Sequence, residues 1–160
     1  MLFVATARRL TIDRFQPTVF SPMSEIPTII SHVSIGTNQF EQAVAFYDAV
    51  MPMLRCRKLE TFPDVVAYGK DFPEFWVQTP FDGQPASVGN GYHIGFLAES
   101  TAQVDAFYAA AIAAGAQGEG APGPRPDYGP AYYGCFVRDL DGHKIEATFW
   151  NAALAAEGAS

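Results

Sequence analysis

Apolar and polar residues alternate in two short stretches of the chain, ISHVSIG at residues 30–36 and NGYHIGF at residues 90–96. Alternation with a period of two is typical of a β-strand that buries one face and leaves the other face polar. In the first stretch His32 falls on the polar face, and in the second His93 does. The pattern therefore predicts two strands, each with a histidine opposite its apolar side.

A helix is predicted directly after each of these strands. Apolar residues recur at intervals of three and four over residues 37–54 and again over residues 100–116, which is the period of an amphipathic helix. Asn38, with Glu41 three residues later, has the pattern of a capping box at the start of the first helix. Gly115 is placed to end the second helix.

The order of these elements repeats along the chain. His32 and His93 are 61 residues apart, and each precedes an aromatic pair in the following helix by 14 and 15 residues. Three short β-like runs follow each helix. One βαβββ unit is too small to cover its own sheet, so two units must pack together. The sequence predicts an α+β fold of two βαβββ modules, about 27–80 and 91–151, in one curved mixed sheet with the helices outside.

The two ends of the chain are set apart from this domain. Residues 1–26 begin with a short apolar stub followed by a basic pair, which does not match a signal peptide. We predict that they form an N-terminal extension to a domain over 27–151, and that residues 152–160 form a C-terminal tail. No stretch approaches the ~20 apolar residues of a membrane span, so no membrane partner is expected.

Composition narrows the choice of partners. Hydrophobic residues make up 49% and charged residues 17% of the 160 residues, as in globular proteins, and the formal net charge is −7. A negative chain is a poor partner for nucleic acid or an anionic membrane, since both require a positive surface. Cys56 and Cys135 have no CxxC neighbour, which predicts reduced thiols in a cytoplasmic protein.

Three side chains with metal-ligand chemistry fall on the predicted polar faces. They are His32, His93 and Glu146, the last in the run HKIEATF, where Glu146 alternates with apolar neighbours. Two histidines and one carboxylate suit divalent Fe, Mn, Co, Ni or Zn and leave coordination positions open. The ordinary alternative is that each histidine is a hydrogen-bonded structural residue, and the pattern alone favours neither interpretation.

Three segments resemble the vicinal oxygen chelate superfamily, which includes glyoxalase I, fosfomycin-resistance enzymes, bleomycin-resistance proteins and extradiol dioxygenases. These segments are HVSIGTNQFEQAVAFYDAVMPML, GYHIGFLAES and FVRDLDGHKIEATF. The resemblance covers residues 27–151 and implies an incompletely closed barrel and a homodimer, with the cavity either within one chain or between two. It also implies that the metal ligands come from the first and last strands of the modules, at His32, His93 and Glu146.

The chain departs from glyoxalase I at the fourth ligand. In that enzyme a glutamate on the last strand of the first module completes the site, and here the corresponding strand reads EFWVQTP, with Trp76 at the ligand position. A shift of register would bring in Glu74 or Gln78 instead. Without a shift, the resemblance implies a three-ligand site in which Trp76 and Gln78 contact the substrate.

Other candidates lie in or beside the long Gly/Pro loop before the last hairpin. Tyr132 and Tyr133 are expected to serve as acid–base groups near the open metal positions. Tyr128 and Arg125 are expected to bind substrate, with the arginine pairing an anionic group. His143, in the turn DLDGHK, is expected to be exposed.

Two functions follow from this set. The first is a glyoxalase-like metal-dependent enzyme that chelates two neighbouring oxygens of a small molecule, as a lyase or isomerase, an epoxide-opening transferase, or a dioxygenase. The alternative is a metal-free protein of the bleomycin-resistance type that sequesters a ligand in an aromatic pocket. The set of His32, His93 and Glu146 separates them, since a pure binder has no need to keep it.

Overall fold

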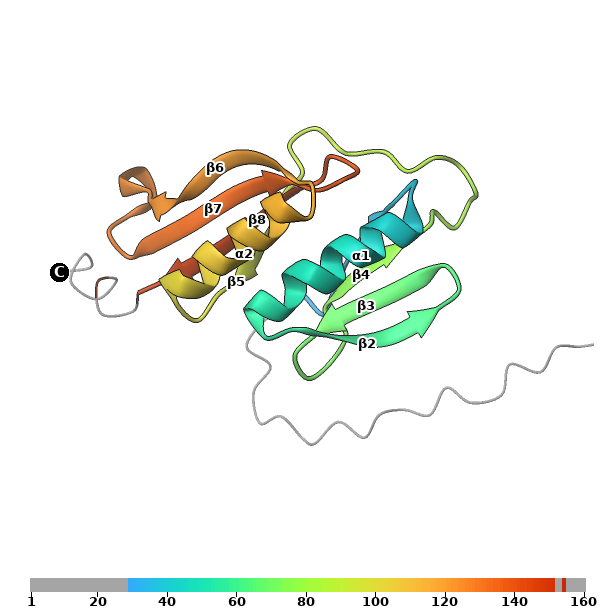
Figure 1. The fold of residues 1–160 in the computed structure, drawn as a ribbon, viewed down its shortest axis with the longest axis horizontal. Coiled ribbons are helices and arrows are strands. Elements are labelled where there is room, and N and C mark those ends of the chain that lie inside the picture. The colour runs from blue at the N-terminus through green and yellow to red at the C-terminus, as the bar shows by residue number, and fades with distance from the viewer. Residues whose placement is uncertain (1–28, 152–153, 155–160) are drawn as a thin grey trace, which may run out of the picture.

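The computed structural model describes residues 29–151 and 154, and it contains the two predicted βαβββ modules (Figure 1). The first module consists of β1 (Val33–Gly36), α1 (Phe40–Val50), η1 (Met51–Leu54), β2 (Arg57–Phe62), β3 (Val65–Gly69) and β4 (Phe75–Gln78). The second consists of β5 (Ile94–Leu97), α2 (Thr101–Ala113), β6 (Gln117–Pro124), η2 (Pro126–Tyr128), β7 (Tyr132–Arg138) and β8 (Lys144–Trp150). The predicted N-terminal extension, and all of the predicted tail except Leu154, lie outside the described residues.

The two sheets have the same topology. Their strand orders are β1-β4-β3-β2 and β5-β8-β7-β6, and in each the first strand pairs in parallel with the last. Ser34 is paired with Trp76 in the first sheet, and Gly95 with Glu146 in the second. Trp76 and Glu146 therefore occupy equivalent positions, as the repeat predicts, and the register shift toward Glu74 or Gln78 does not occur.

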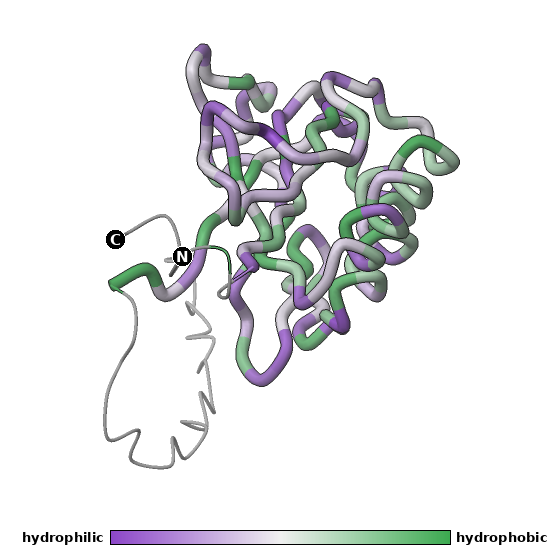
Figure 2. Tube along the Cα trace, turned by 90° about the vertical axis from the view of Figure 1, so that its left-hand side faces the viewer, coloured by the Kyte–Doolittle hydropathy of each residue, from purple (hydrophilic) through white to green (hydrophobic). Residues whose placement is uncertain are grey.

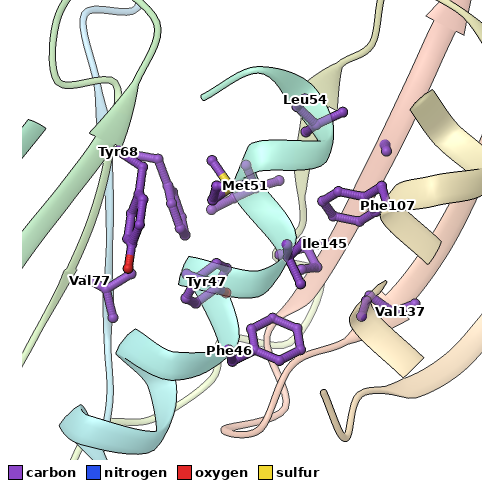
Figure 3. Close-up of a cluster of buried hydrophobic side chains, with 14 of the residues drawn as sticks. Phe46, Tyr47, Met51, Leu54, Tyr68, Val77, Phe107, Val137 and Ile145 are labelled. Carbon is purple, nitrogen blue, oxygen red and sulfur yellow. The ribbon is translucent and has the colours of Figure 1, made fainter. Parts of the chain in front are cut away.

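The apolar faces of both sheets share one core. α1 and α2 lie side by side over their sheets (Figure 1), and Figure 2 shows apolar stretches in the helices and in the strands beside them. Side chains of α1 and η1 lie between the strands of the first sheet and β8 of the second (Figure 3). Aromatic rings of the two modules pack against each other, since the ring centroids of Phe75 in β4 and Phe96 in β5 are 5.0 Å apart. The polar face of each sheet is therefore the face turned away from the common core.

One junction between the modules is a partly buried hydrogen-bond network. The turn between β7 and β8 docks on the loop after β1, where Thr37 Oγ1 donates to Asp141 Oδ2 at 2.5 Å and Gln39 Nε2 donates to the carbonyl of Leu140 at 2.9 Å. His143 Nε2 donates to the carbonyl of Gly36 at 2.7 Å. These contacts join residues about a hundred positions apart and fix the two modules together.

Two local expectations are wrong at this junction. His143 is 3% exposed because the first module covers its turn. The capping box is absent: Gln39 is the N-cap of α1 and makes no side-chain cap. The Asn38 side chain instead bonds the backbone N–H and carbonyl of Ala86, at 2.8 and 3.0 Å, so it secures the connector between the modules, residues 79–93.

A second junction lies at the equivalent place in the repeat and is exposed. Glu99, just after β5, pairs with Lys70 at 2.7 Å and with Arg55 at 2.9 Å. The Lys70 bond and the nearby Arg55 charge lower the pKa of Glu99. Exposed pairs of this kind contribute little to stability, so the hydrogen-bond network around His143 is expected to contribute more to holding the modules together.

Asp139→Ala is expected to destabilise the protein by about 3 kcal/mol, a large effect for one substitution. The Asp139 carboxylate accepts from the Tyr47 hydroxyl at 2.6 Å and from the backbone N–H groups of Asp141 and His143 at 3.0 and 2.8 Å. Tyr47 is fully buried, so its hydroxyl would lose its partner. Urea denaturation measures the change, with the exposed Asp127→Ala as control, expected within about 0.5 kcal/mol of wild type. A loss below about 1 kcal/mol for Asp139→Ala would contradict the role given to this junction.

Candidate functional site

The polar face of the second sheet gathers three of the predicted site residues. Glu146 is 7% exposed, and its Oε2 lies 2.6 Å from His93 Nε2. Its other oxygen, Oε1, accepts a hydrogen bond from the Tyr132 hydroxyl at 2.6 Å. Burial and the neighbouring Glu146 raise the pKa of Tyr132, so the hydroxyl keeps its proton at neutral pH. We refer to His93, Glu146 and Tyr132 as the His–Glu–Tyr cluster.

One glycine on β7 makes this cluster possible. A Cβ at Gly134 would lie 2.2 Å from the Tyr132 hydroxyl oxygen, so only glycine allows the ring to lie along β7 toward Glu146. Gly95 stands directly opposite Glu146, and a Cβ there would lie 3.4 Å from Oε2, at the edge of ordinary contact. Gly134, in the sequence YYGCF, therefore allows the Tyr132 hydroxyl to contact Glu146.

Gly134→Ala is expected to displace the Tyr132 hydroxyl from Glu146. Because burial and the negative charge of Glu146 raise the pKa of Tyr132, its titration should move back toward the ordinary tyrosine range of about 10. NMR of ring-labelled tyrosine measures this, and Gly95→Ala is the matched control, because its Cβ fits without displacing the ring. An unchanged Tyr132 titration in Gly134→Ala would show that the glycine does not control the contact.

His32 lies on the other polar face, that of the first sheet. Its ring is exposed, its Nδ1 lies 3.2 Å from Ser31 Oγ, and its ring centroid lies 6.2 Å from that of Trp76. Across residues 29–151 and 154, no three His, Cys, Asp or Glu side chains are grouped so that they could hold a metal ion. One copy of the chain thus brings two of the three predicted ligands together, because the shared core separates the two polar faces.

The prediction of a Gly/Pro loop over residues 117–130 is wrong in its first half, since Gln117–Pro124 form β6 paired with β7. The candidates in and beside this segment divide between the two faces of the second sheet. Tyr128 packs edge-on against Tyr132, with ring centroids 5.0 Å apart, and Arg125 lies 5.8 Å from the ring of Phe136, which is paired with Glu146. Tyr133 is not at the site, since its hydroxyl donates to Asp105 of α2 at 2.9 Å. Adjacent residues of a strand point to opposite faces, so only one tyrosine of the pair reaches Glu146.

Trp76 and Gln78 lie with His32 rather than with the His–Glu–Tyr cluster. Trp76 is paired with Ser34 and Gln78 with Gly36 on β1. The indole Nε1 of Trp76 is buried and has no hydrogen-bond partner among the described residues. An unpartnered buried donor is costly, and the described residues supply no acceptor for it.

A pocket of about 420 Å³ adjoins the cluster and was not predicted from the sequence. It lies between the connector and the start of β8, and it is lined by Val88, Gly89, Asn90, Gly91, Tyr92, His93, Arg138 and Lys144. Across β7 and β8, Arg138 is paired with Lys144. Alternation from Glu146 places Lys144 on the same face, and that signal was present in the sequence.

The family of the chain follows from comparison with known proteins. The model of the Glyoxalase/Bleomycin resistance protein/Dioxygenase superfamily matches residues 29–147. The chain belongs to this superfamily. The repeat of βαβββ modules and the position of Glu146 agree with the resemblance found in the sequence. No curated protein gives a significant match.

Several solved structures share the fold. A glyoxalase/bleomycin resistance protein from Albidiferax ferrireducens T118 is 38% identical, with a TM-score of 0.70 over 76% of this chain and 98% of that one. A glyoxalase/bleomycin resistance protein/dioxygenase family enzyme from Burkholderia phytofirmans PsJN is 17% identical, with a TM-score of 0.58 over 76% and 98%. TioX from Micromonospora sp. ML1 is 21% identical, with a TM-score of 0.54 over 74% and 93%. In the part of the chain that is described, no helix has the length and apolar character needed to cross a membrane.

Proposed function

We propose that the protein is a metal-dependent enzyme of this superfamily that acts on a small oxygen-bearing molecule. The observation that carries the proposal is the contact of 2.6 Å between His93 and the buried carboxylate of Glu146. A buried carboxylate is expensive unless a cation or hydrogen bonds compensate its charge. An imidazole and a carboxylate at one point fit two positions of a two-histidine, one-carboxylate metal site.

The third ligand in this proposal is His32 of a second copy. In the proposed homodimer, the first-module polar face of one copy covers the His–Glu–Tyr cluster of the other. Two features support it: His32 is exposed, and large apolar side chains are exposed on the face around Glu146. Leu97 is 72% and Trp150 50% exposed there, which is typical of a surface that becomes covered.

Each residue then has a defined role. A divalent ion held by His32, His93 and Glu146 would supply Lewis acidity toward two neighbouring oxygens of the substrate. Tyr132, which keeps its proton at neutral pH, holds the carboxylate in one orientation through its hydrogen bond to Oε1. Trp76 of the covering copy would form one wall of the cavity. Such chelation serves a lyase or isomerase, an epoxide-opening transferase, or a dioxygenase.

Gln78, Arg125 and Tyr128 complete the proposed substrate cavity. Gln78 is half-buried beside Gly36 and would come with Trp76 from the covering copy. Arg125 and Tyr128 lie at the rim of the second-module face, near the ring of Phe136 and the ring of Tyr132. The two unpaired thiols fit the cytoplasm as the place where this enzyme works.

A second candidate function is metal-free ligand binding, and one observation favours it. Both oxygens of Glu146 already have partners within one chain, His93 and Tyr132. Trp150 lies 5.3 Å from Tyr132 between ring centroids, so the face also offers an aromatic surface for stacking. Metal content separates this function from the first.

The test is elemental analysis of the full chain, purified without a histidine tag or chelator. We expect about one Fe, Mn, Co, Ni or Zn per chain, as for a dedicated site of this kind, and a dimer by light scattering. Metal below about a tenth of an ion per chain, unchanged after incubation with each of these ions, would contradict the enzyme proposal and favour the metal-free binder.

A further inference from the structure

Arg138 and Lys144 form a pair of cations at the pocket beside His93. Three other cations pair with carboxylates elsewhere, since Arg55 and Lys70 pair with Glu99 and Lys58 pairs with Asp48. The chain as a whole has a net charge of −7, so a pocket lined by two cations differs from the overall negative charge of the protein. The alternation of the sheet sets Lys144 on β8 two residues before Glu146, which places the cations beside the His–Glu–Tyr cluster.

The cations are held in place and keep donors available. Arg138 donates from Nε to Glu119 Oε1 at 2.5 Å and from Nη1 to the Gly142 carbonyl at 2.9 Å, and neither contact uses Nη2. Lys144 Nζ lies 3.4 Å from Glu119 Oε2 and 5.1 Å from the centroid of Phe136. The hydrogen bond from Arg138 lowers the pKa of Glu119, so this group stays ionised. Two positive charges against one negative leave a net charge of one positive.

We propose that this pocket binds a carboxylate group of the substrate, which makes the substrate a small organic anion. This inference rests on the proposed function, because it places a neighbouring substrate oxygen at His93 and Glu146. Lys144 and Glu146 stand two residues apart on the same face of β8, so their backbone positions are about 6–7 Å apart, a spacing that suits a short acid with an adjacent oxygen. A volume of about 420 Å³ admits a molecule of this size. The single net positive charge matches a carboxylate, whereas a phosphate group carries about −1.5 to −2.

The experiment measures ligand binding to the full chain after exhaustive treatment with a chelator, so that it does not depend on the metal. The probes are glycolate, its neutral counterpart ethylene glycol, and inorganic phosphate, followed by NMR shifts of the backbone amides around Gly91 and Tyr92. We expect glycolate to bind with a Kd on the order of millimolar, ethylene glycol to bind at least about tenfold more weakly, and phosphate no more tightly than glycolate.

Charge variants on both sides of the pair sharpen the test. Lys144→Gln should weaken glycolate binding about five- to tenfold, and Glu119→Gln should tighten it about two- to fivefold. Arg57→Gln removes an exposed cation on β2 and serves as the matched control, with no change expected. Wild-type affinity in Lys144→Gln, equal binding of glycolate and ethylene glycol, or a preference for phosphate would overturn the inference. A protein that binds glycolate in this way but takes up no metal would uphold the carboxylate pocket and contradict only the proposed metal-dependent function.

Discussion

Replacing His93 by Ala, or Glu146 by Gln, is expected to remove most of the bound metal while the fold remains intact. Each change deletes one of the three proposed ligands, and loss of a ligand should lower metal affinity on the order of 100-fold or more, at least as much as loss of a supporting group. The His93 side chain is 43% exposed, so its removal leaves no buried cavity. Glu146→Gln keeps the size of the side chain and one oxygen that can accept from Tyr132.

Competition with a chelator of known affinity measures the effect, and the melting temperature confirms that each variant is folded. Glu60→Gln, an exposed carboxylate on β2, is the matched control for loss of one negative charge and should bind metal like wild type. Wild-type metal content in both His93→Ala and Glu146→Gln would show that these residues are not ligands.

The local features of the fold were predictable because they depend on short-range periodicity. Alternation around His32 and His93 fixed which side of each strand is polar, and the helical spacing that follows fixed the order of elements. The equivalence of Trp76 and Glu146 followed from the repeat alone. The strand registers of the structure confirm it.

The predictions that were wrong depend on residues that are distant in the sequence. His143 sits in a turn whose sequence is typical of an exposed loop, yet the Gly36 carbonyl and the rest of the first module cover it. Asn38 stands where a helix cap is expected from the sequence, but its side chain bonds the backbone of Ala86 in the connector instead. Neither partner is near in sequence, so no local pattern reveals it.

Only part of the candidate site could be predicted from the sequence, again because local patterns do not reveal contacts between distant residues. Periodicity shows that His32, His93 and Glu146 all lie on polar faces, but it does not show how two modules are placed relative to each other. The shared core, built around Phe75 and Phe96, turns the faces away from each other. The structure therefore joins His93 to Glu146 and leaves His32 apart, which is why the proposed site requires two copies.

The second large effect is expected when two defective chains are combined. His32→Ala and Glu146→Gln should each bind metal on the order of 100-fold more weakly than wild type as separate homodimers. In a heterodimer of the two, one proposed site contains both changes. The other contains His32 from the Glu146→Gln chain together with His93 and Glu146 from the His32→Ala chain. That second site is intact, so metal binding should return.

The metal content of such heterodimers, isolated after co-expression, tests the shared site most directly. The control is a heterodimer of a wild-type chain and a chain that carries both changes. A site shared between copies predicts about one tightly held ion in the His32→Ala/Glu146→Gln heterodimer and none in the control heterodimer, where each site has lost a ligand. The opposite result, an ion in the control and none in the His32→Ala/Glu146→Gln pair, would place all three ligands within one chain and contradict the shared site.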